Sequence, residues 1–309
     1  MGDTYQLHKG EASLLDLVDG SLAMGAAGAK SVYYVDNNAG SDGNDGSSWE
    51  YSMKTLSAAL ALSHADIASG ASGWAARNVI FFKGDQSADA DGENLVLLAQ
   101  KTDIIGVGST SQYPQSTLVG AHVPISATGI GVRFINVRFK CPAAGGSMFT
   151  LNATQRGIEF INCTFDATNT AAATSAIIAT AVWFLKIKNC RFVGPFAGTV
   201  ISIAAGNARG LDISDNYIEG AAAGISLATG VTSTPDNMLV ARNTMRVGAV
   251  GITDTDETLL QIVDNRVTTT AAKGSAGVGA IIGNEYLAMG NLISASDLVG
   301  AVWPVLGTV

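Results

Sequence analysis

Two aspartates and an arginine have a spacing that could support carbohydrate cleavage if the chain coils into stacked strands. Asp215, Arg242 and Asp264 recur at intervals of 27 and 22 residues. Stacked strands lie about 4.8 Å apart, so carboxylates two strands apart are separated by about 9.6 Å, near the upper end for inverting glycosidases. A cation between two acids stabilises their charged forms, however, whereas a general acid must keep its proton. We therefore favour a structural column of alternating charge over a catalytic pair.

Three arginines and a tyrosine could form a binding face for sugars. The residues that share one outward position of the repeat described below are Arg138, Arg191, Tyr217 and Arg266. Tyr217 offers a ring on which a sugar could stack. Thr164 separates Arg138 from Arg191, and Tyr217 and Thr244 separate Arg191 from Arg266. Keeping like charges apart in this way is also what a stable sheet requires. We favour the structural role and keep sugar binding as the alternative.

An Asp- and Asn-rich loop offers oxygen ligands suited to calcium. Its candidate ligands are Asp36, Asp42 and Asp45, together with Asn38 and Asn44. No Glu stands at the twelfth position of either EF-hand register, so we favour a glycine-rich turn, with a metal site as the alternative. A second acidic stretch, which contains Asp85, Asp89, Asp91 and Glu93, is interpreted as a solvated loop. No metal and no other cofactor is expected.

The nucleophilic and metal-ligating side chains follow no catalytic pattern. Cys141, Cys163 and Cys190 are an odd number in a long chain, which is typical of reduced, buried thiols. The three histidines, at positions 8, 64 and 122, form no Ser/His/Asp or metal-spacing motif. No glycine-rich phosphate loop stands between a strand and a helix.

The elements that would position these residues form an internal repeat of about 26 residues. An apolar anchor follows an Asn-containing turn signal at Phe139, Phe165, Phe192, Ile218, Met245, Val267 and Ile293. The positions seven and five residues before each anchor are also apolar, which is the alternation of a strand with one buried face. Such a repeat predicts a stack of similar coils.

Charges at one outward position of the repeat alternate in sign. Six residues before the anchors stand Arg133, Glu159, Lys186 and Asp212. In a parallel, in-register stack these side chains are neighbours, so the alternation forms an ion-pair ladder without like-charge contacts. Asp215, Arg242 and Asp264 repeat the pattern three residues before their anchors.

An inward position two residues before the anchor changes from small apolar residues to asparagine. It reads Val137, Cys163, Cys190, Asn216, Asn243, Asn265 and Asn291. We expect these Asn amides to stack, to bond backbone groups and to adopt the left-handed conformation that Asn tolerates.

The N-terminal third has a different organisation. Residues 31–36 predict a strand, and residues 52–69 predict a helix with Ser52 as its N-cap and Gly70 after its end. Further strands are predicted at residues 79–82, 95–98 and 103–107.

These features resemble the pectate-lyase-like superfamily of right-handed parallel β-helices. The resemblance covers residues 31 to about 295 and rests on YYVDNNAGSDGNDGSSW, KTLSAALAL, VIFFKGD, IIGVGS and the Asn-bearing coils. It implies an all-β solenoid whose opening strand and short helix cap the first coil. Lyases of this fold use Asp-bound calcium with a basic residue, and hydrolases use carboxylates on neighbouring coils. The motifs are specific for the fold and weak for any activity.

Domain boundaries follow from the repeat. Residues 1–30 are interpreted as an arm whose attachment face is Leu14, Leu15, Leu17 and Val18; a loose tail or a second cap is the alternative. Residues 31–295 form the β-helix, with the cap and first coils at 31–120 and regular coils at 132–295. Residues 296–309 are a closing segment.

Composition excludes some partners. The net charge of −8 and pI near 4.8 argue against nucleic-acid binding. No run reaches the roughly 18 apolar residues of a membrane helix, and residues 1–10 lack the basic start of a secretion signal.

An acidic β-helix with little unexplained charge and no signal resembles the spike and decoration proteins of bacteriophage virions. That resemblance implies a non-enzymatic homotrimer that contacts capsid or tail proteins. A tailspike depolymerase or lyase acting on bacterial surface polysaccharide is the alternative, and a secreted carbohydrate-binding adhesin is a weaker third.

Overall fold

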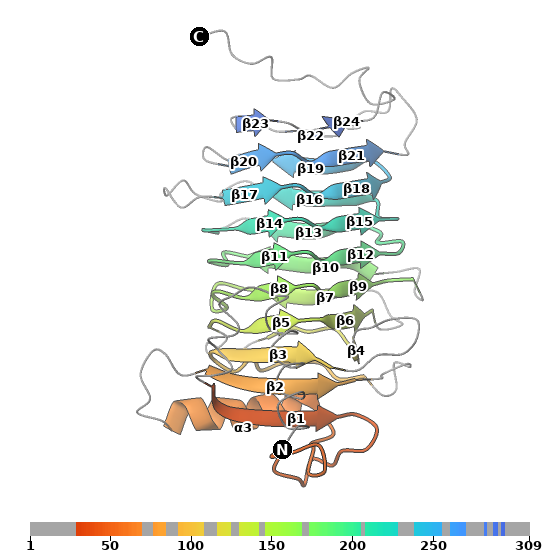
Figure 1. Cartoon of the computed structure of the whole chain (residues 1–309). Helices are drawn as coiled ribbons and strands as arrows, with labels where there is room; N and C mark the ends of the chain where they lie inside the picture. The colour runs from red at the N-terminus through yellow and green to blue at the C-terminus, as the bar shows by residue number, and fades with distance from the viewer. Residues whose placement is uncertain are drawn as a thin grey trace, which may run out of the picture.

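Strands of three parallel sheets recur in a fixed order along the chain and form a stack of coils. The computed structural model describes residues 29–69, 77–84, 92–107, 116–124, 130–141, 146–168, 173–204, 208–227, 238–254, 260–269, 281–282, 287–289 and 292–293. Figure 1 shows the coils following one another from the N-terminal to the C-terminal end of the stack. This is the mostly β, parallel β-solenoid with one N-terminal helix that the repeat predicted. Its right-handed turn stays a prediction.

The described strands group into three sheets. Sheet A is β1 (Ala29–Asp36), β2 (Arg77–Lys83), β3 (Thr102–Gly106), β5 (Arg133–Ile135), β8 (Glu159–Ile161), β11 (Lys186–Lys188), β14 (Asp212–Ser214), β17 (Met238–Ala241), β20 (Leu260–Val263) and β23 (Leu287–Met289). Sheet B is β4 (Ser116–Val119), β6 (Val137–Lys140), β9 (Thr164–Asp166), β12 (Arg191–Val193), β15 (Tyr217–Glu219), β18 (Thr244–Val247), β21 (Arg266–Thr269) and β24 (Leu292–Ile293). Sheet C is β7 (Gly146–Leu151), β10 (Ala173–Thr180), β13 (Thr199–Ala204), β16 (Ala223–Leu227), β19 (Val250–Asp254) and β22 (Ile281–Ile282).

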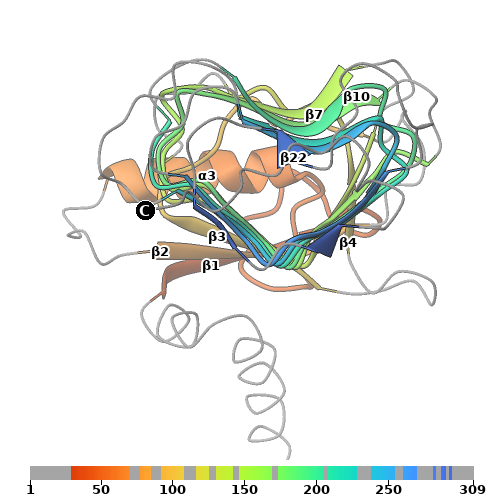
Figure 2. The same ribbon diagram turned by 90° about the horizontal axis from the view of Figure 1, so that it is seen from above.

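The register of sheet B confirms the anchor column. Phe139 pairs with Phe165, and the pairing continues through every predicted anchor to Ile293. The coil between Met245 and Val267 is only 22 residues long and still keeps this register, because the missing residues lie outside the strands of sheets A and B. Viewed along the stack in Figure 2, strands of successive coils superimpose as the three sides of one outline.

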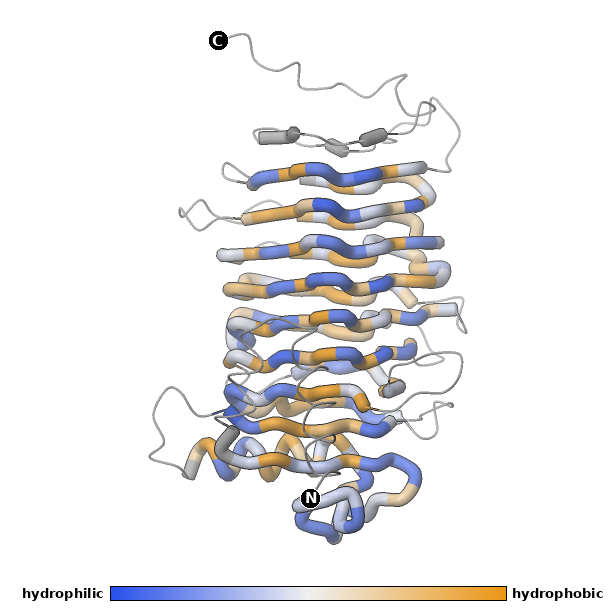
Figure 3. Tube along the Cα trace, viewed as in Figure 1, coloured by the Kyte–Doolittle hydropathy of each residue, from blue (hydrophilic) through white to orange (hydrophobic). Residues whose placement is uncertain are grey.

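The interior of the stack is a continuous apolar core. Phe134 stacks on Phe160 at 5.4 Å, and Phe165 stacks on Phe192 at 4.7 Å, with nearly parallel rings in both pairs. Figure 3 shows apolar and polar residues alternating along the strands, with the same alternation repeated from coil to coil. Each identical or similar pair therefore buries its surface against the coils on either side.

The turn from sheet A to sheet B corrects one expectation. Its left-handed residue is the one three positions before the anchor, and these residues are Asn136, Asn162, Asn189, Asp215, Arg242 and Asp264, with φ between 52° and 61°. The inward asparagines stand one position later. Asn and Asp tolerate this conformation because their short polar side chains bond locally, whereas Arg242 adopts it at a steric cost.

Helix α3 (Leu56–Ser69) covers the N-terminal end of the core. Leu56 and Leu60 are fully buried, and Figures 1 and 2 together place the helix beneath the outline of the coils. The predicted N-cap was wrong: the helix begins three residues later than the Ser52 cap implied, and the hydroxyl of Thr55 accepts the N–H of Ala58.

Glu93 also binds the start of this helix, which corrects its interpretation as part of a solvated loop. Its carboxylate accepts the N–H groups of Leu56 and Ser57 at 2.8 and 2.9 Å. A carboxylate is favoured there because the first N–H groups of a helix lack internal partners. The other three acids of that stretch lie outside the described residues.

Two further differences concern the N-terminal strands. Residues 95–98 do not form a ladder strand, although Leu95 and Leu98 are buried, because the N–H of Leu95 donates to the Nδ1 atom of His122 instead. The free edge of β1 is occupied by the loop that follows it: Tyr34 donates to Gly46 O, and Asp36 donates to Met53 O, both at 2.9 Å.

Candidate functional site

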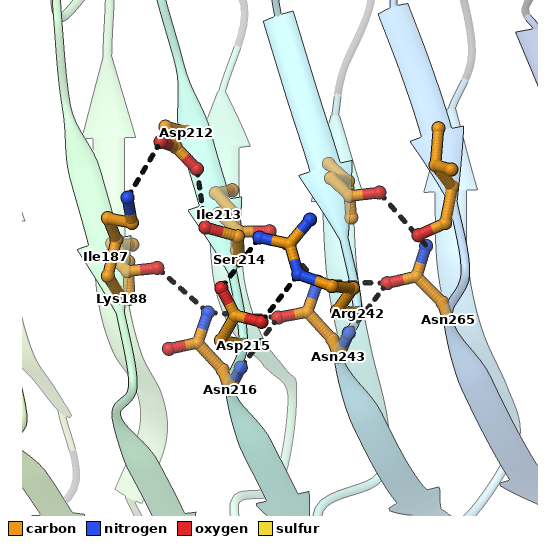
Figure 4. A network of polar contacts seen from close by, with 12 residues as sticks. Ile187, Lys188, Asp212, Ile213, Ser214, Asp215, Asn216, Arg242, Asn243 and Asn265 are labelled. Carbon is orange, nitrogen blue, oxygen red and sulfur yellow. Dashed lines mark hydrogen bonds and ion pairs between the residues drawn. The ribbon is translucent and has the colours of Figure 1, made fainter.

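The candidate catalytic residues lie on the turn between sheets A and B, where Asp215 and Arg242 form a two-point ion pair. The Nε atom of Arg242 donates to Oδ1 of Asp215 at 2.6 Å, and an Nη atom donates to Oδ2 at 2.7 Å (Figure 4). The hydrogen bonds from Arg242 lower the pKa of Asp215 below its usual value. This carboxylate is therefore held in its charged form, which a general acid cannot use.

Asp264 occupies the same turn position one coil further on, so the predicted order of acid, base and acid is present. The hydrogen bonds to Asp215 raise the pKa of Arg242, and the negative charges of Asp215, Asp212 and Asp264 add to this effect. The three side chains form an exposed column of alternating charge. The arrangement neutralises charge between coils, and its one paired acid offers no proton for transfer.

Directly beside this column runs a buried ladder of asparagine amides. Asn216 Nδ2 donates to Asn243 Oδ1 at 2.9 Å, and Asn243 Nδ2 donates to Asn265 Oδ1 at 2.9 Å (Figure 4). The same oxygens accept backbone N–H groups of the preceding coil, and the amides also bond the carbonyls of Ile187, Ile213 and Val240. Stacking and backbone bonding are confirmed for these three asparagines, and Asn291 lies outside the described residues. Full hydrogen bonding is what makes burial of these amides tolerable.

The outward charges of sheet A form a longer ladder than the repeat predicted. Asp103 precedes Arg133 in the register, so the column reads Asp103, Arg133, Glu159, Lys186 and Asp212. Asp103 is almost fully buried and lies at 2.5 Å from guanidinium nitrogens of both Arg77 and Arg133. Lys186 pairs with Glu159 at 3.0 Å, whereas Asp212 pairs with Lys188 at 3.6 Å. The strand at 103–107 was the signal that could have found Asp103.

The predicted sugar-binding column lies on the outer face of sheet B. Arg138 is tied to the buried Asp166 through two nitrogens. Burial alone raises the pKa of Asp166, but hydrogen bonds from Thr168 and Arg138 outweigh it and leave that pKa below its usual value. Arg138 is therefore engaged by its own chain.

The other members of this column lie further along the sheet. The Arg191 guanidinium lies 5.7 Å from the centre of the Tyr217 ring, and the Tyr217 hydroxyl donates to Glu219 at 3.0 Å. Glu219 and Arg246, 3.7 Å apart, line an open hollow of about 300 Å³ at the end of these strands. Arg266 is exposed one coil beyond Thr244. Sequence reasoning missed Glu219 and Arg246 because they follow the anchor instead of preceding it.

The candidate calcium ligands are engaged separately by neighbouring groups. Asp36 accepts the N–H groups of Asn38 and Ala39 and pairs with Lys83 at 2.7 Å. Burial alone raises the pKa of Asp36, but these partners outweigh it and lower the pKa overall. The Asp42 carboxylate accepts from Lys54 N and Thr55, and that of Asp45 accepts from Ser47 N. Within the described ranges, no group of three His, Cys, Asp or Glu side chains could hold a metal ion.

Cys141, Cys163 and Cys190 are free and buried, as predicted. Burial raises the pKa of the Cys190 thiol well above its usual value, so the reactive thiolate is disfavoured. The predicted attachment residues at 14, 15, 17 and 18, and the closing segment at 296–309, lie outside the described residues.

In the part of the chain that the structure describes, no helix is long and apolar enough to cross a membrane. Comparisons of the chain with protein-family models, curated proteins and solved structures gave no match.

Proposed function

We propose that this protein is a non-enzymatic structural component of a bacteriophage virion, a right-handed β-helical spike or decoration protein on capsid or tail that acts as a homotrimer. The proposal includes membership of the pectate-lyase-like superfamily, on the motifs quoted above. It rests on one observation: the candidate catalytic acid Asp215 is committed to a two-point ion pair with Arg242.

The surrounding chemistry supports a scaffold. Asp103, Glu159 and Asp212 are each engaged by a lysine or arginine on the same or an adjacent coil. Charges that stabilise stacked strands are not free to move protons or to take up substrate. Ion pairs between neighbouring coils make the solenoid a stiff rod, and a stiff rod suits a protein that projects from a virus particle.

The oligomeric state tests the assembly. Light scattering or mass photometry should give about three times 31.6 kDa. A species of one chain at micromolar concentration would exclude the trimer.

A tailspike depolymerase or lyase is the second candidate, favoured by the open hollow beside Glu219 and Arg246. Incubation with bacterial capsular and O-antigen polysaccharides, with and without calcium, should release neither reducing ends nor unsaturated sugars. Asp215→Asn is the matched control. Release by the wild type that this variant lacks would assign catalysis to Asp215 and overturn the proposal.

A further inference from the structure

The corner between sheets C and A carries an exposed aromatic and cationic patch, which we define as Ile130, Arg156, Trp183, Phe184 and Arg209. Ile130, Arg156, Trp183 and Arg209 occupy one position in successive coils, because each is bridged in parallel to the next. Phe184 follows Trp183 and is 50 % exposed, and Ile130 is 42 % exposed. None of these residues belongs to the columns described above.

Phe184 is held in a conformation that its own side chain opposes. Its φ is 57°, a left-handed value that bulky residues rarely adopt. The corresponding residues of the neighbouring coils are Gly131, Gly157 and Gly210, with φ between 60° and 70°. A glycine would meet the backbone requirement without strain, so the fold does not explain a phenylalanine here. Strain retained at an exposed aromatic is a feature of binding sites.

The ring of Phe184 leans towards one neighbouring coil and leaves the other open. A Cβ on Gly210 would lie 2.5 Å from Cδ1 of Phe184, so the ring covers that glycine. A Cβ on Gly157 would meet only the backbone of Gly131, at 3.6 Å. Gly131 and Gly157 therefore form a shelf of backbone next to the exposed ring, and the Arg77 guanidinium lies beside it, 3.6 Å from the position of a Cβ on Gly131.

The cations of the patch have no carboxylate partner among the described residues. The guanidinium carbons of Arg156 and Arg209 lie 4.0 and 4.8 Å from the centre of the Trp183 ring, and neither arginine forms a described ion pair. The Nε atom of Arg209 is buried without a hydrogen-bond partner. Arg77, Arg133, Arg138, Arg242 and Arg246 each pair with an acid, whereas Arg191 and Arg266 on sheet B form no described ion pair either. In a chain of net charge −8, two unneutralised arginines beside an apolar ring favour an anionic ligand.

We propose that this corner binds a glycan containing carboxylate-bearing sugars. The C–H face of a pyranose ring would lie on the glycine shelf against Phe184, and its carboxylate would pair with Arg156 or Arg209. Trp183 acts as a positioning residue, because it holds the two guanidinium groups through cation–π contacts. The inference goes beyond the proposed function, since it holds for a monomer and for a protein outside any virion.

The test is calorimetric titration of the full chain with a tetramer of α2,8-linked sialic acid and a glucuronate-containing hyaluronan tetrasaccharide, with maltotetraose as the neutral probe. We expect at least one acidic probe to bind and maltotetraose not to bind. Phe184→Gly should weaken binding at least tenfold while leaving the unfolding midpoint unchanged or higher, because it relieves the left-handed strain. Arg266→Ala, which removes an exposed arginine from sheet B, should bind as the wild type does.

Failure of both acidic probes to bind, equal binding of maltotetraose, or wild-type affinity in Phe184→Gly would overturn the proposal. A lower oligomeric mass in that variant would assign the patch to contacts between copies instead. None of these results changes the expected absence of polysaccharide cleavage, so the two proposals fail separately.

Discussion

At the scale of single residues, His122 is a polar group placed in the apolar core. It is fully buried between Phe149, at 4.6 Å, and Phe139, at 6.0 Å between ring centres. Its Nδ1 atom accepts the N–H of Leu95, so the proton is on Nε2, which has no partner. Burial lowers the pKa of His122 to about 3. The folded protein therefore holds this ring neutral.

We predict that His122 makes the fold less stable as the pH falls. The unfolded chain takes up a proton near pH 6.5 and the folded chain only near pH 3, so stability is lost across that window. Between pH 6.5 and pH 4.5 the loss is about 3 kcal/mol at 1.36 kcal/mol per pH unit. Chemical unfolding at several pH values measures it. His122→Asn, which keeps an acceptor for Leu95, should flatten this dependence, and an unchanged slope in the variant would contradict the prediction.

Two aspartates in similar ladders differ in burial, and their substitution should differ accordingly. Asp103 is 1 % exposed and is shared by two arginines, whereas the Asp215 side chain is 33 % exposed and its partner Arg242 is 52 % exposed. We expect Asp103→Asn to cost about 3 kcal/mol, because it leaves the largely buried guanidinium groups of Arg77 and Arg133 without their carboxylate. Asp215→Asn should cost less than about 1 kcal/mol, because water screens an exposed pair. Urea unfolding of both variants compares them, and equal costs would be the contrary result.

At the scale of elements, two features that we expected at one residue of the turn between sheets A and B, the left-handed conformation and the stacked amide, lie at two consecutive residues. The exposed position adopts the left-handed conformation, and the following inward position carries the buried amide ladder. Each of these asparagines bonds backbone groups of the preceding coil, and the amides of Asn216 and Asn243 also donate to the asparagine of the following coil. The ladder therefore couples neighbouring coils through hydrogen bonds as well as apolar contact.

Removing the middle of this ladder should be costly. We expect Asn243→Ala to lower the free energy of unfolding by about 3 kcal/mol, because the N–H and amide of Asn216 and the carbonyl of Ile213 lose their partner in a dry site. Asn189→Gly is the matched control, since Asn189 is exposed and left-handed. It should change stability by less than about 0.5 kcal/mol. Thermal unfolding of both variants tests this, and similar losses would contradict the assigned role.

At the scale of the whole molecule, the N-terminal end solves a problem that stacked strands create. An open sheet edge pairs readily with another chain. Here α3 covers the core, and residues 46–53 bond the free edge of β1. Both features lie in residues 31–69, where the resemblance to pectate-lyase-like β-helices implied a cap on the first coil.

Loosening the loop from that edge should promote association. A Cβ on Gly40 would lie 2.1 Å from the carbonyl oxygen of Met53, whereas one on Gly43 would meet only a serine hydroxyl at 3.6 Å. We therefore expect Gly40→Ala to displace the loop and to give concentration-dependent species larger than the wild type in light scattering. Gly43→Ala should match the wild type. Identical scattering of the two variants would show that the loop does not protect the edge.

The sequence alone determined the coil, its register and the alternating charges from residue 132 onward. This was possible because residues in contact between neighbouring coils are a nearly constant number of positions apart. Residues that pack together therefore recur periodically in the sequence. The shortened interval before Val267 did not disturb this reading, since turn and anchor residues identify the column without counting.

Only the tertiary structure decided where the pattern is broken. The structure adds Asp103 to the charge ladder and shows that Thr55, and not Ser52, caps the helix. It also places the left-handed conformation at the residue before each buried asparagine. Phe184 stood out only once the structure showed that its position, like those of Gly131, Gly157 and Gly210, takes a left-handed backbone conformation. The helix cap and Asp103 lie before the regular repeat, and the sequence does not show which backbone conformation, burial or ion pairing a repeated position will have. These properties became visible only once the coils were assembled.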